Sequence, residues 1–164
     1  MTSFIRFFFT YLVFQSIAFA QPSEIDIKAI ASDYFDVYAE RKNFNDFMLF
    51  YDENVVLEDI VYGNQIKGKS ALSAFFNWPD EKFVMTSEVN LVLSQLLVDG
   101  VQVSAQGYFT QFEYGGEVMG PWRFTMHLTF NERGKIVKQV DWINYTPREN
   151  FLGGENLNDS LPSL

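Results

Sequence analysis

Hydrophobic and polar residues alternate most regularly along residues 122–130 and again along residues 135–145. Alternation with a period of two predicts β-strands that have one apolar and one polar face. The intervening residues, Asn131-Glu132-Arg133-Gly134, predict a tight turn, because glycine readily takes the positive φ that closes such a hairpin. The sequence therefore predicts a hairpin at the end of the domain.

This hairpin places an acid on an apolar face. If Phe130 faces Lys135 across the turn, Phe124 faces Asp141 on the returning strand. A carboxylate among aromatic side chains costs free energy to bury unless it is hydrogen-bonded, paired or protonated. Asp141 is therefore the first candidate for a functional residue. Two other residues share its predicted face: Trp122 and Met126.

The same alternation extends backwards along the chain. Residues 84–98 and 101–114 predict two long strands, and Asp99-Gly100 between them is a strong hairpin signal. Pairing through the next turn, at residues 114–117, sets Phe109 opposite Trp122 and puts Gln111 on the same face. Gln111 is thus predicted either to contact a ligand or, alternatively, to bond to the backbone at the rim.

The N-terminal half has helical spacing instead. Residues 26–39, 44–51 and 69–77 predict three helices, and residues 55–62 predict a strand that follows a turn at 52–54. An irregular connection is expected over residues 63–68. Helices followed by a meander of strands predict an α+β domain, with the helices packed on one face of a curved antiparallel sheet.

The ends of the chain set the domain limits. Residues 1–20 combine Arg6, a short apolar run and the cleavage motif Ala18-Phe19-Ala20, which predicts a secretory signal and a secreted or periplasmic location. An uncleaved N-terminal anchor is the alternative. The domain is expected over residues 21–151, and residues 152–164 lack periodicity and predict a mobile tail.

Composition narrows the possible partners. The formal charge of −9 argues against nucleic acid and against an anionic membrane surface, because both are bound through Lys and Arg. The chain has no cysteine and one histidine, His127, which is predicted on the outer face of the sheet. These counts favour neither a metal site nor a Ser-His-Asp triad, and no cofactor is expected. The 18% of aromatic residues suits a cavity for a small apolar molecule.

Three segments together resemble the NTF2-like superfamily, especially its SnoaL-like and ketosteroid-isomerase-like branches: residues 50–59, 66–72 with Phe75-Phe76, and 130–136. The resemblance covers roughly residues 26–145. It implies a cone-shaped α+β fold in which three N-terminal helices pack on the concave side of a curved antiparallel sheet. This fold hosts enzymes, binding proteins and dimerisation modules alike.

The resemblance implies parts of two catalytic schemes. The steroid-isomerase base falls on Asp59, whereas the tyrosine of its oxyanion hole falls on or beside Phe35, with Tyr34 and Tyr38 as the nearest hydroxyls. The acid of that oxyanion hole falls near Met126, which donates no hydrogen bond. The limonene-epoxide-hydrolase-like branch has an acid that matches Asp141, but its Arg-x-Asp pair would fall around residues 109–111, where neither charge is present.

Asp59 and Asp141 are therefore the predicted catalytic residues. Two carboxyls near one apolar cavity can differ strongly in pKa, so that one acts as an acid and the other as a base. Alternatively, each acid caps a backbone group or lies at the rim, and the aromatic residues only fill the core. The predicted ligand contacts are Tyr34, Tyr38, Phe109, Gln111, Trp122, Phe124 and Met126.

Three functions stay open at this point. The first is an acid–base isomerase, hydrolase or cyclase that acts on a small hydrophobic molecule without metal or cofactor. The second is a non-catalytic protein that binds such a molecule, and the third is a dimerisation module. Val140 and Trp142 on an otherwise polar sheet face predict a homodimer in each case.

Overall fold

The computed structural model describes residues 25–145 and 156–162. Three α-helices come from the N-terminal half: α1 (Ile27–Glu40), α2 (Phe44–Leu49) and α3 (Lys69–Phe76). A short 3-10 helix, η2 (Leu157–Ser160), lies near the C-terminus. The strands are β1 (Tyr51–Asp59), β2 (Asn64–Lys67), β3 (Phe83–Met85), β4 (Leu91–Asp99), β5 (Gln102–Phe109), β6 (Phe112–Tyr114), β7 (Glu117–Met119), β8 (Trp122–Phe130) and β9 (Ile136–Ile143).

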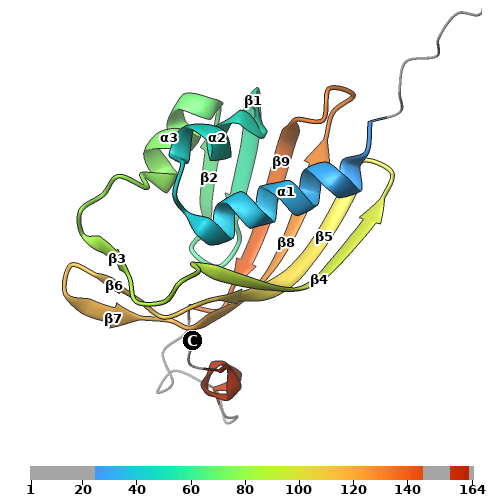
Figure 1. The fold of residues 1–164 in the computed structure, drawn as a ribbon. Helices are drawn as coiled ribbons and strands as arrows, with labels where there is room; N and C mark the ends of the chain where they lie inside the picture. Colours follow the sequence, from blue (N-terminus) through green and yellow to red (C-terminus); the bar gives the residue numbers. More distant parts are fainter. Residues whose placement is uncertain (1–24, 146–155, 163–164) are drawn as a thin grey trace, which may run out of the picture.

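The main sheet has six strands in the order β2-β1-β9-β8-β5-β4, and α1 crosses one of its faces (Figure 1). The expected α+β fold with helices on one side of a curved sheet is confirmed. The expectation of a wholly antiparallel sheet is wrong at one pair, because β1 runs parallel to β9. No hairpin joins these two strands, so no turn fixes their relative direction.

Helix α1 forms where the spacing predicts it. The Asp26 side chain caps its start by accepting a hydrogen bond from the amide of Ala29 at 3.0 Å. One stripe of the helix is buried against the sheet and consists of Ile27, Ala31, Tyr34, Phe35 and Tyr38. The helix ends at Arg41, whose backbone is left-handed with φ 49°. This stripe supplies much of the aromatic core.

The long predicted strands are each interrupted. Residues 86–90, 110–111 and 120–121 lie between strands, and the segments beyond these breaks form a separate sheet in the order β3-β6-β7. Hydrogen bonds hold the breaks together: the Thr110 hydroxyl donates to Val89 O at 2.7 Å and the Thr110 amide donates to Asn90 O at 2.9 Å. The small sheet extends past the end of the main sheet (Figure 1).

The register of the last hairpin differs from the expected one. Phe130 pairs with Ile136 rather than with Lys135, and an irregularity beyond this pair sets Met126 opposite Asp141. The total shift is two residues, so Asp141 keeps the predicted apolar face. Ile136, which alternation alone would place outside, is fully buried. The predicted pairing of Phe109 with Trp122 is confirmed.

Two N-terminal connections are more regular than expected. Residues 52–54 were expected to turn but belong to β1, and residues 63–68 were expected to be irregular but contain β2. Asp52 is accommodated in a strand because its carboxylate accepts hydrogen bonds from the Asn54 amide and the Asn131 side chain, both at 3.0 Å. No helix within the described residues is long and apolar enough to cross a membrane.

Candidate active site

A cavity of about 290 Å³ opens between α1, the end of the main sheet and the small sheet. Most of its wall is aromatic: Tyr38, Phe75, Phe76, Phe83, Phe109, Phe112, Trp122 and Tyr145. Ile143 completes the apolar part. Four polar or charged residues also line it: Arg41, Asp59, Asn90 and Asp141. The cavity thus joins a large apolar surface to a few polar groups, which is typical of small-molecule sites.

Both predicted acids line this cavity. Asp59 ends β1 and Asp141 lies in β9, and the parallel register pairs the two residues directly. Neighbouring strands are about 4.8 Å apart, so the two side chains leave the sheet side by side. Asp59 is 3% exposed and Asp141 is 5% exposed. The arrangement therefore holds two buried carboxyls next to each other.

Hydrogen bonds fix the carboxylate of Asp59 from two sides. Its Oδ1 atom accepts bonds from the amides of Val61 and Tyr62, both at 3.2 Å, and its Oδ2 atom accepts one from the Tyr145 hydroxyl at 3.0 Å. The Tyr145 ring lies 4.9 Å from the ring of Trp122. Asp59 is thereby held in place by its own turn and by an aromatic residue of the cavity wall.

Asp141 is held by one buried side chain. The Nε2 atom of Gln139 donates to both carboxylate oxygens of Asp141, at 3.0 and 2.9 Å. The Oε1 atom of Gln139 accepts a hydrogen bond from the Tyr51 hydroxyl at 2.7 Å, and Tyr51 is 2.8 Å from the Tyr34 hydroxyl. This buried chain of polar groups fixes which end of the Gln139 amide faces the acid.

The two acids differ in their electrostatic surroundings. The pKa of the Asp141 carboxyl is raised to about 7: burial raises it most, the hydrogen bond from Gln139 lowers it, and the negative charge of Asp59 raises it. At neutral pH Asp141 is therefore present in both protonated and ionised forms. A carboxyl with this pKa can both give and accept a proton near physiological pH.

The predicted ligand contacts separate into two groups. Tyr38, Phe109 and Trp122 line the cavity with the acids. Tyr34 and Met126 are fully buried in the core and do not line it.

The other two predicted contacts also lie elsewhere. Phe124 packs in the core between Phe35 and Phe109, with ring centroids at 6.5 and 5.2 Å. Gln111 is exposed, because it lies in the break between β5 and β6 rather than in a continuous strand. Its backbone carbonyl accepts a hydrogen bond from the Thr86 hydroxyl at 2.6 Å.

Four polar residues of the site were not predicted, and neither were five apolar residues of its wall: Phe75, Phe76, Phe83, Phe112 and Ile143. Tyr145 shares the strand parity of Asp141, so alternation along β9 could have identified it. Gln139 shares that parity as well. Arg41 and Asn90 lie in connecting segments that reach the cavity only through the tertiary fold, and no periodicity in the sequence points to them.

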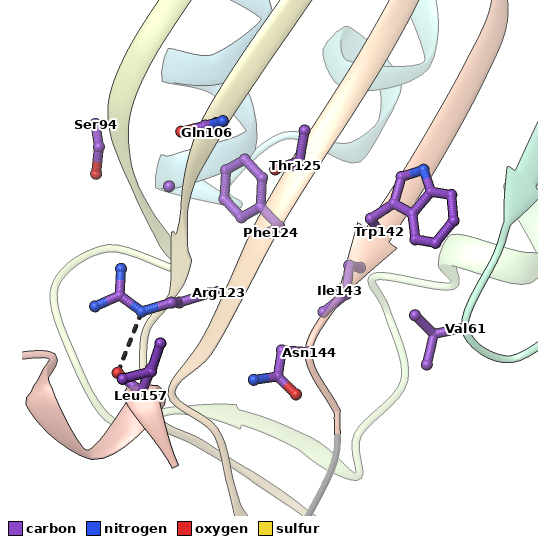
Figure 2. A pocket seen from close by; sticks show the side chains of 11 residues that line it. Val61, Ser94, Gln106, Arg123, Phe124, Thr125, Trp142, Ile143, Asn144 and Leu157 are labelled. Atoms are coloured by element: carbon purple, nitrogen blue, oxygen red, sulfur yellow. Dashed lines mark hydrogen bonds between the residues drawn. The ribbon is translucent and has the colours of Figure 1, made fainter. Parts of the chain in front are cut away.

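A second and larger cavity, of about 650 Å³, lies on the opposite face of the main sheet. Figure 2 shows Gln106, Thr125 and Trp142 on this face, with α1 behind the sheet. Trp142 is 52% exposed. This cavity contains neither predicted acid, so it is separate from the candidate active site.

The C-terminal segment borders this outer cavity. The expected mobile tail contains η2, which contacts the main sheet: Arg123 donates from Nε to Leu157 O at 3.2 Å and from Nη2 to the Ser160 hydroxyl at 3.1 Å (Figure 2 draws the first bond). The Asn158 side chain accepts from the Arg123 amide at 3.2 Å. Residues 156–162 are therefore attached to the domain, whereas the start of the expected tail lies outside the described residues.

Comparisons with solved structures agree with this fold. A protein named as a SnoaL-like polyketide cyclase from Shewanella denitrificans OS-217 superposes with a TM-score of 0.61 at 16% identity, over 73% of this chain and 90% of the other. A protein named as a ketosteroid isomerase from Kribbella flavida DSM 17836 gives 0.56 at 17%, over 84% and 89%. A limonene-epoxide-hydrolase-like epoxide hydrolase from M. tuberculosis gives 0.59 at 10%, over 72% and 82%.

At these identities the structural matches establish the fold alone. A search of curated protein sequences found no match. The family comparison is more specific, because the model of the SnoaL-like domain matches residues 31–139, which is more than half of the chain and includes most of α1 and most of the main sheet. The chain therefore belongs to the SnoaL-like family of the NTF2-like superfamily.

Proposed function

We propose that this protein is an acid–base enzyme that transfers a proton to or from a small, mostly apolar molecule, as an isomerase, cyclase or hydrolase. One observation carries the proposal: two buried carboxyls from adjacent parallel strands share an aromatic cavity of about 290 Å³, and burial raises the pKa of Asp141 to about 7. A general acid or base is most effective when its pKa lies near the working pH.

Asp141 is the proposed proton carrier. Its two oxygens are both held by Gln139, so the carboxyl is fixed in orientation before a ligand binds. Asp59 contributes its negative charge beside Asp141, which favours the return of a proton to Asp141 after each transfer. The aromatic wall limits the access of water and contacts the apolar part of the substrate.

Tyr38 is the proposed hydrogen-bond donor to a substrate oxygen. It lines the cavity, and within the described part of the chain its hydroxyl has no hydrogen-bond partner. Burial and the charge of Asp141 raise the pKa of this hydroxyl, so it stays protonated and can donate at neutral pH. Tyr34 is unsuited to this role, because its hydroxyl is bonded to Tyr51 inside the core.

The variant Asp141→Asn tests the proposal, because it retains the size and most of the hydrogen-bonding capacity of the acid but cannot carry the proton. Ligands that copurify with the exported protein are first identified by native mass spectrometry, and turnover of these compounds is then assayed. We expect Asp141→Asn to lose turnover by at least about 10²-fold. Asp99→Asn, the same substitution in the β4–β5 hairpin, should retain full activity.

The same variant has a defined effect on stability. The raised folded pKa means that the stabilising contribution of Asp141 is present below its unfolded pKa of about 3.9 and is lost as the pH rises through about 7. The free energy of unfolding of the wild type, measured with urea, should therefore decrease as the pH rises from about 3.9 to about 7. The decrease should be smaller in Asp141→Asn, which has no carboxyl at this position. Titration of Asp141 at an ordinary carboxyl pKa in a carboxyl NMR experiment would refute the assigned role.

A non-catalytic ligand-binding protein is the second candidate. Two features of the sequence favour it. The chain lacks the complete pair of oxyanion donors that the ketosteroid-isomerase scheme requires, and it lacks the Arg-x-Asp pair of the limonene-epoxide-hydrolase scheme. One measurement distinguishes the two candidates. A binding protein should leave its ligand chemically unchanged, and Asp141→Asn should then only weaken ligand binding.

We also propose that the protein is exported from the cell. N-terminal sequencing of the exported protein tests this proposal, because the mature chain should start at Gln21.

A further inference from the structure

Arg41 occupies a position that normally favours a different residue. It ends α1 with a left-handed backbone, φ 49° and ψ 30°, and its amide donates to Val37 O at 3.1 Å. Glycine or asparagine is the usual residue here, because other side chains clash in this conformation at a cost of about 1 kcal/mol. A non-glycine residue held in such a conformation suggests that its side chain has a use.

The side chain of Arg41 lies against the cavity wall. Its guanidinium carbon is 3.9 Å from the ring centroid of Phe83 and 5.0 Å from that of Trp78. The guanidinium therefore lies over both rings, and such cation–π contacts do not use its N–H donors. Arg41 and Phe83 both line the cavity that contains the acids.

No acid of the protein neutralises this cation in the part of the chain that is described. The four salt bridges found there involve Lys42, Lys69, Arg133 and Lys138, and the only side-chain partners of Arg41 there are the two rings. The Arg41 side chain is half-buried, so water solvates the guanidinium only in part, and this burial lowers its pKa. A partly buried, unpaired guanidinium beside a cavity is a site for an anion.

The cavity therefore has groups of opposite charge at different places. Asp59 and Asp141 come from the main sheet, whereas Arg41 comes from the end of α1, three residues after Tyr38. Tyr38 lines the same cavity, where burial and the charge of Asp141 raise the pKa of its hydroxyl and the charge of Arg41 lowers it. A ligand that spans the cavity meets the acids at one end and the cation at the other.

We propose that Arg41 binds a carboxylate of the ligand, so that the substrate class is apolar carboxylic acids that also carry the reacting group. The proposal rests on the proposed function of the cavity and narrows it. A carboxylate matches the two-donor edge of a guanidinium, and its single charge suits a cavity with one cation and two acids. A phosphate carries more negative charge than this cavity neutralises.

The test compares two probes of the same size and shape, 1-naphthylacetate and 1-naphthylacetamide, which differ in charge. Isothermal titration calorimetry is run on the mature protein at about pH 6, where the probe acid is ionised and Asp141 is mostly protonated. The wild type should bind the carboxylate about tenfold more tightly than the amide, as expected for a charge-assisted hydrogen-bonded pair in a partly buried site.

Arg41→Asn should remove this preference, because asparagine tolerates the left-handed backbone and carries no charge. Binding of the amide should change by less than about twofold. Arg41→Lys keeps the charge but loses the planar fork, so it should retain part of the preference. Lys42→Gln removes the neighbouring, exposed cation and should behave like the wild type.

Three outcomes would overturn the inference. Equal binding of both probes to the wild type refutes the anion site but leaves the cavity as a ligand site. Equal weakening of both probes by Arg41→Asn shows that Arg41 only supports the wall through Phe83 and Trp78; thermal unfolding of each variant reports this role separately. Failure of both probes to bind the wild type contradicts the proposed function of the cavity and the anion site together.

Discussion

A single amide explains how an acid is buried in this core. Gln139 is fully buried, donates to both oxygens of Asp141 and accepts from Tyr51. Without this amide, the ionised carboxyl would have no hydrogen-bond donor among the described residues. The position of Gln139 two residues before Asp141 in a strand puts both side chains on one face, which is the reason that they meet.

Replacement of this amide should change the titration of the acid. Gln139→Leu removes the donor to the ionised form of Asp141, so the pKa of Asp141 should rise above about 7 in a carboxyl NMR titration. The free energy of unfolding should fall by about 1–3 kcal/mol, since the Tyr51 hydroxyl also loses its acceptor. Tyr51→Phe is the matched control, because Gln139 keeps its bond to Asp141. A larger pKa increase in Tyr51→Phe than in Gln139→Leu would contradict this account.

At the scale of elements, the strands contain bulges and breaks that the alternation of hydrophobic and polar residues does not predict. Alternation along β9 gave the face of Asp141 correctly, because a shift of two residues preserves parity. It misplaced Ile136, because the extra residue beside the turn reverses parity there. It also gave three long strands in place of six shorter ones, since the breaks are stabilised by contacts such as Thr110 with Asn90 that are distant in sequence.

Gly107 marks another of these irregularities. It lies in β5 opposite Leu93, where the pairing with β4 skips Ser94, and glycine is typical of such bends. A Cβ atom at this position would lie 2.2 Å from Val92 O and 2.8 Å from the ring of Phe124. The absence of a side chain thus allows two strands and a core ring to approach closely.

Gly107→Ala should therefore destabilise the protein. One contact would be with backbone, which cannot move without displacing β4, so we expect a loss of about 1–3 kcal/mol in urea unfolding. Ser104→Ala, on the same strand but with a Cβ already present, should change the free energy of unfolding by less than about 0.5 kcal/mol. A Gly107→Ala variant as stable as the wild type would show that the sheet can flatten at this point without cost.

For the whole molecule, the sequence predicted the architecture and the two acids but not the full wall of the cavity. The acids lie on regular strands, where parity identifies the face, whereas Arg41 and Asn90 follow from the course of connecting segments. The predicted signal at residues 1–20 lies outside the described residues and stays a prediction. The predicted homodimer also stays a prediction, and Trp142 on its proposed face is exposed.

The homodimer prediction centres on Trp142, which is 52% exposed on the outer face of the sheet. If this face is the interface, Trp142→Glu should convert the dimer to a monomer, because a charge would be buried against the same residue of a second copy. Light scattering measures the change in mass. Leu49→Glu, the same kind of substitution at an exposed residue of α2, should leave the mass unchanged. A monomeric wild type would end the prediction.

The parallel pairing of β1 with β9 has a consequence for the order of folding. These strands are consecutive in the sheet but are separated by most of the domain in sequence, so their contact has one of the highest sequence separations in the fold. Contacts of this kind are slow to form because a long loop must close first. Asp59 and Asp141 are therefore brought together only when the last strand docks, and a chain still lacking its C-terminal strand holds one carboxyl without the other. The proposed acid–base activity would then report on completion of the domain as the chain refolds.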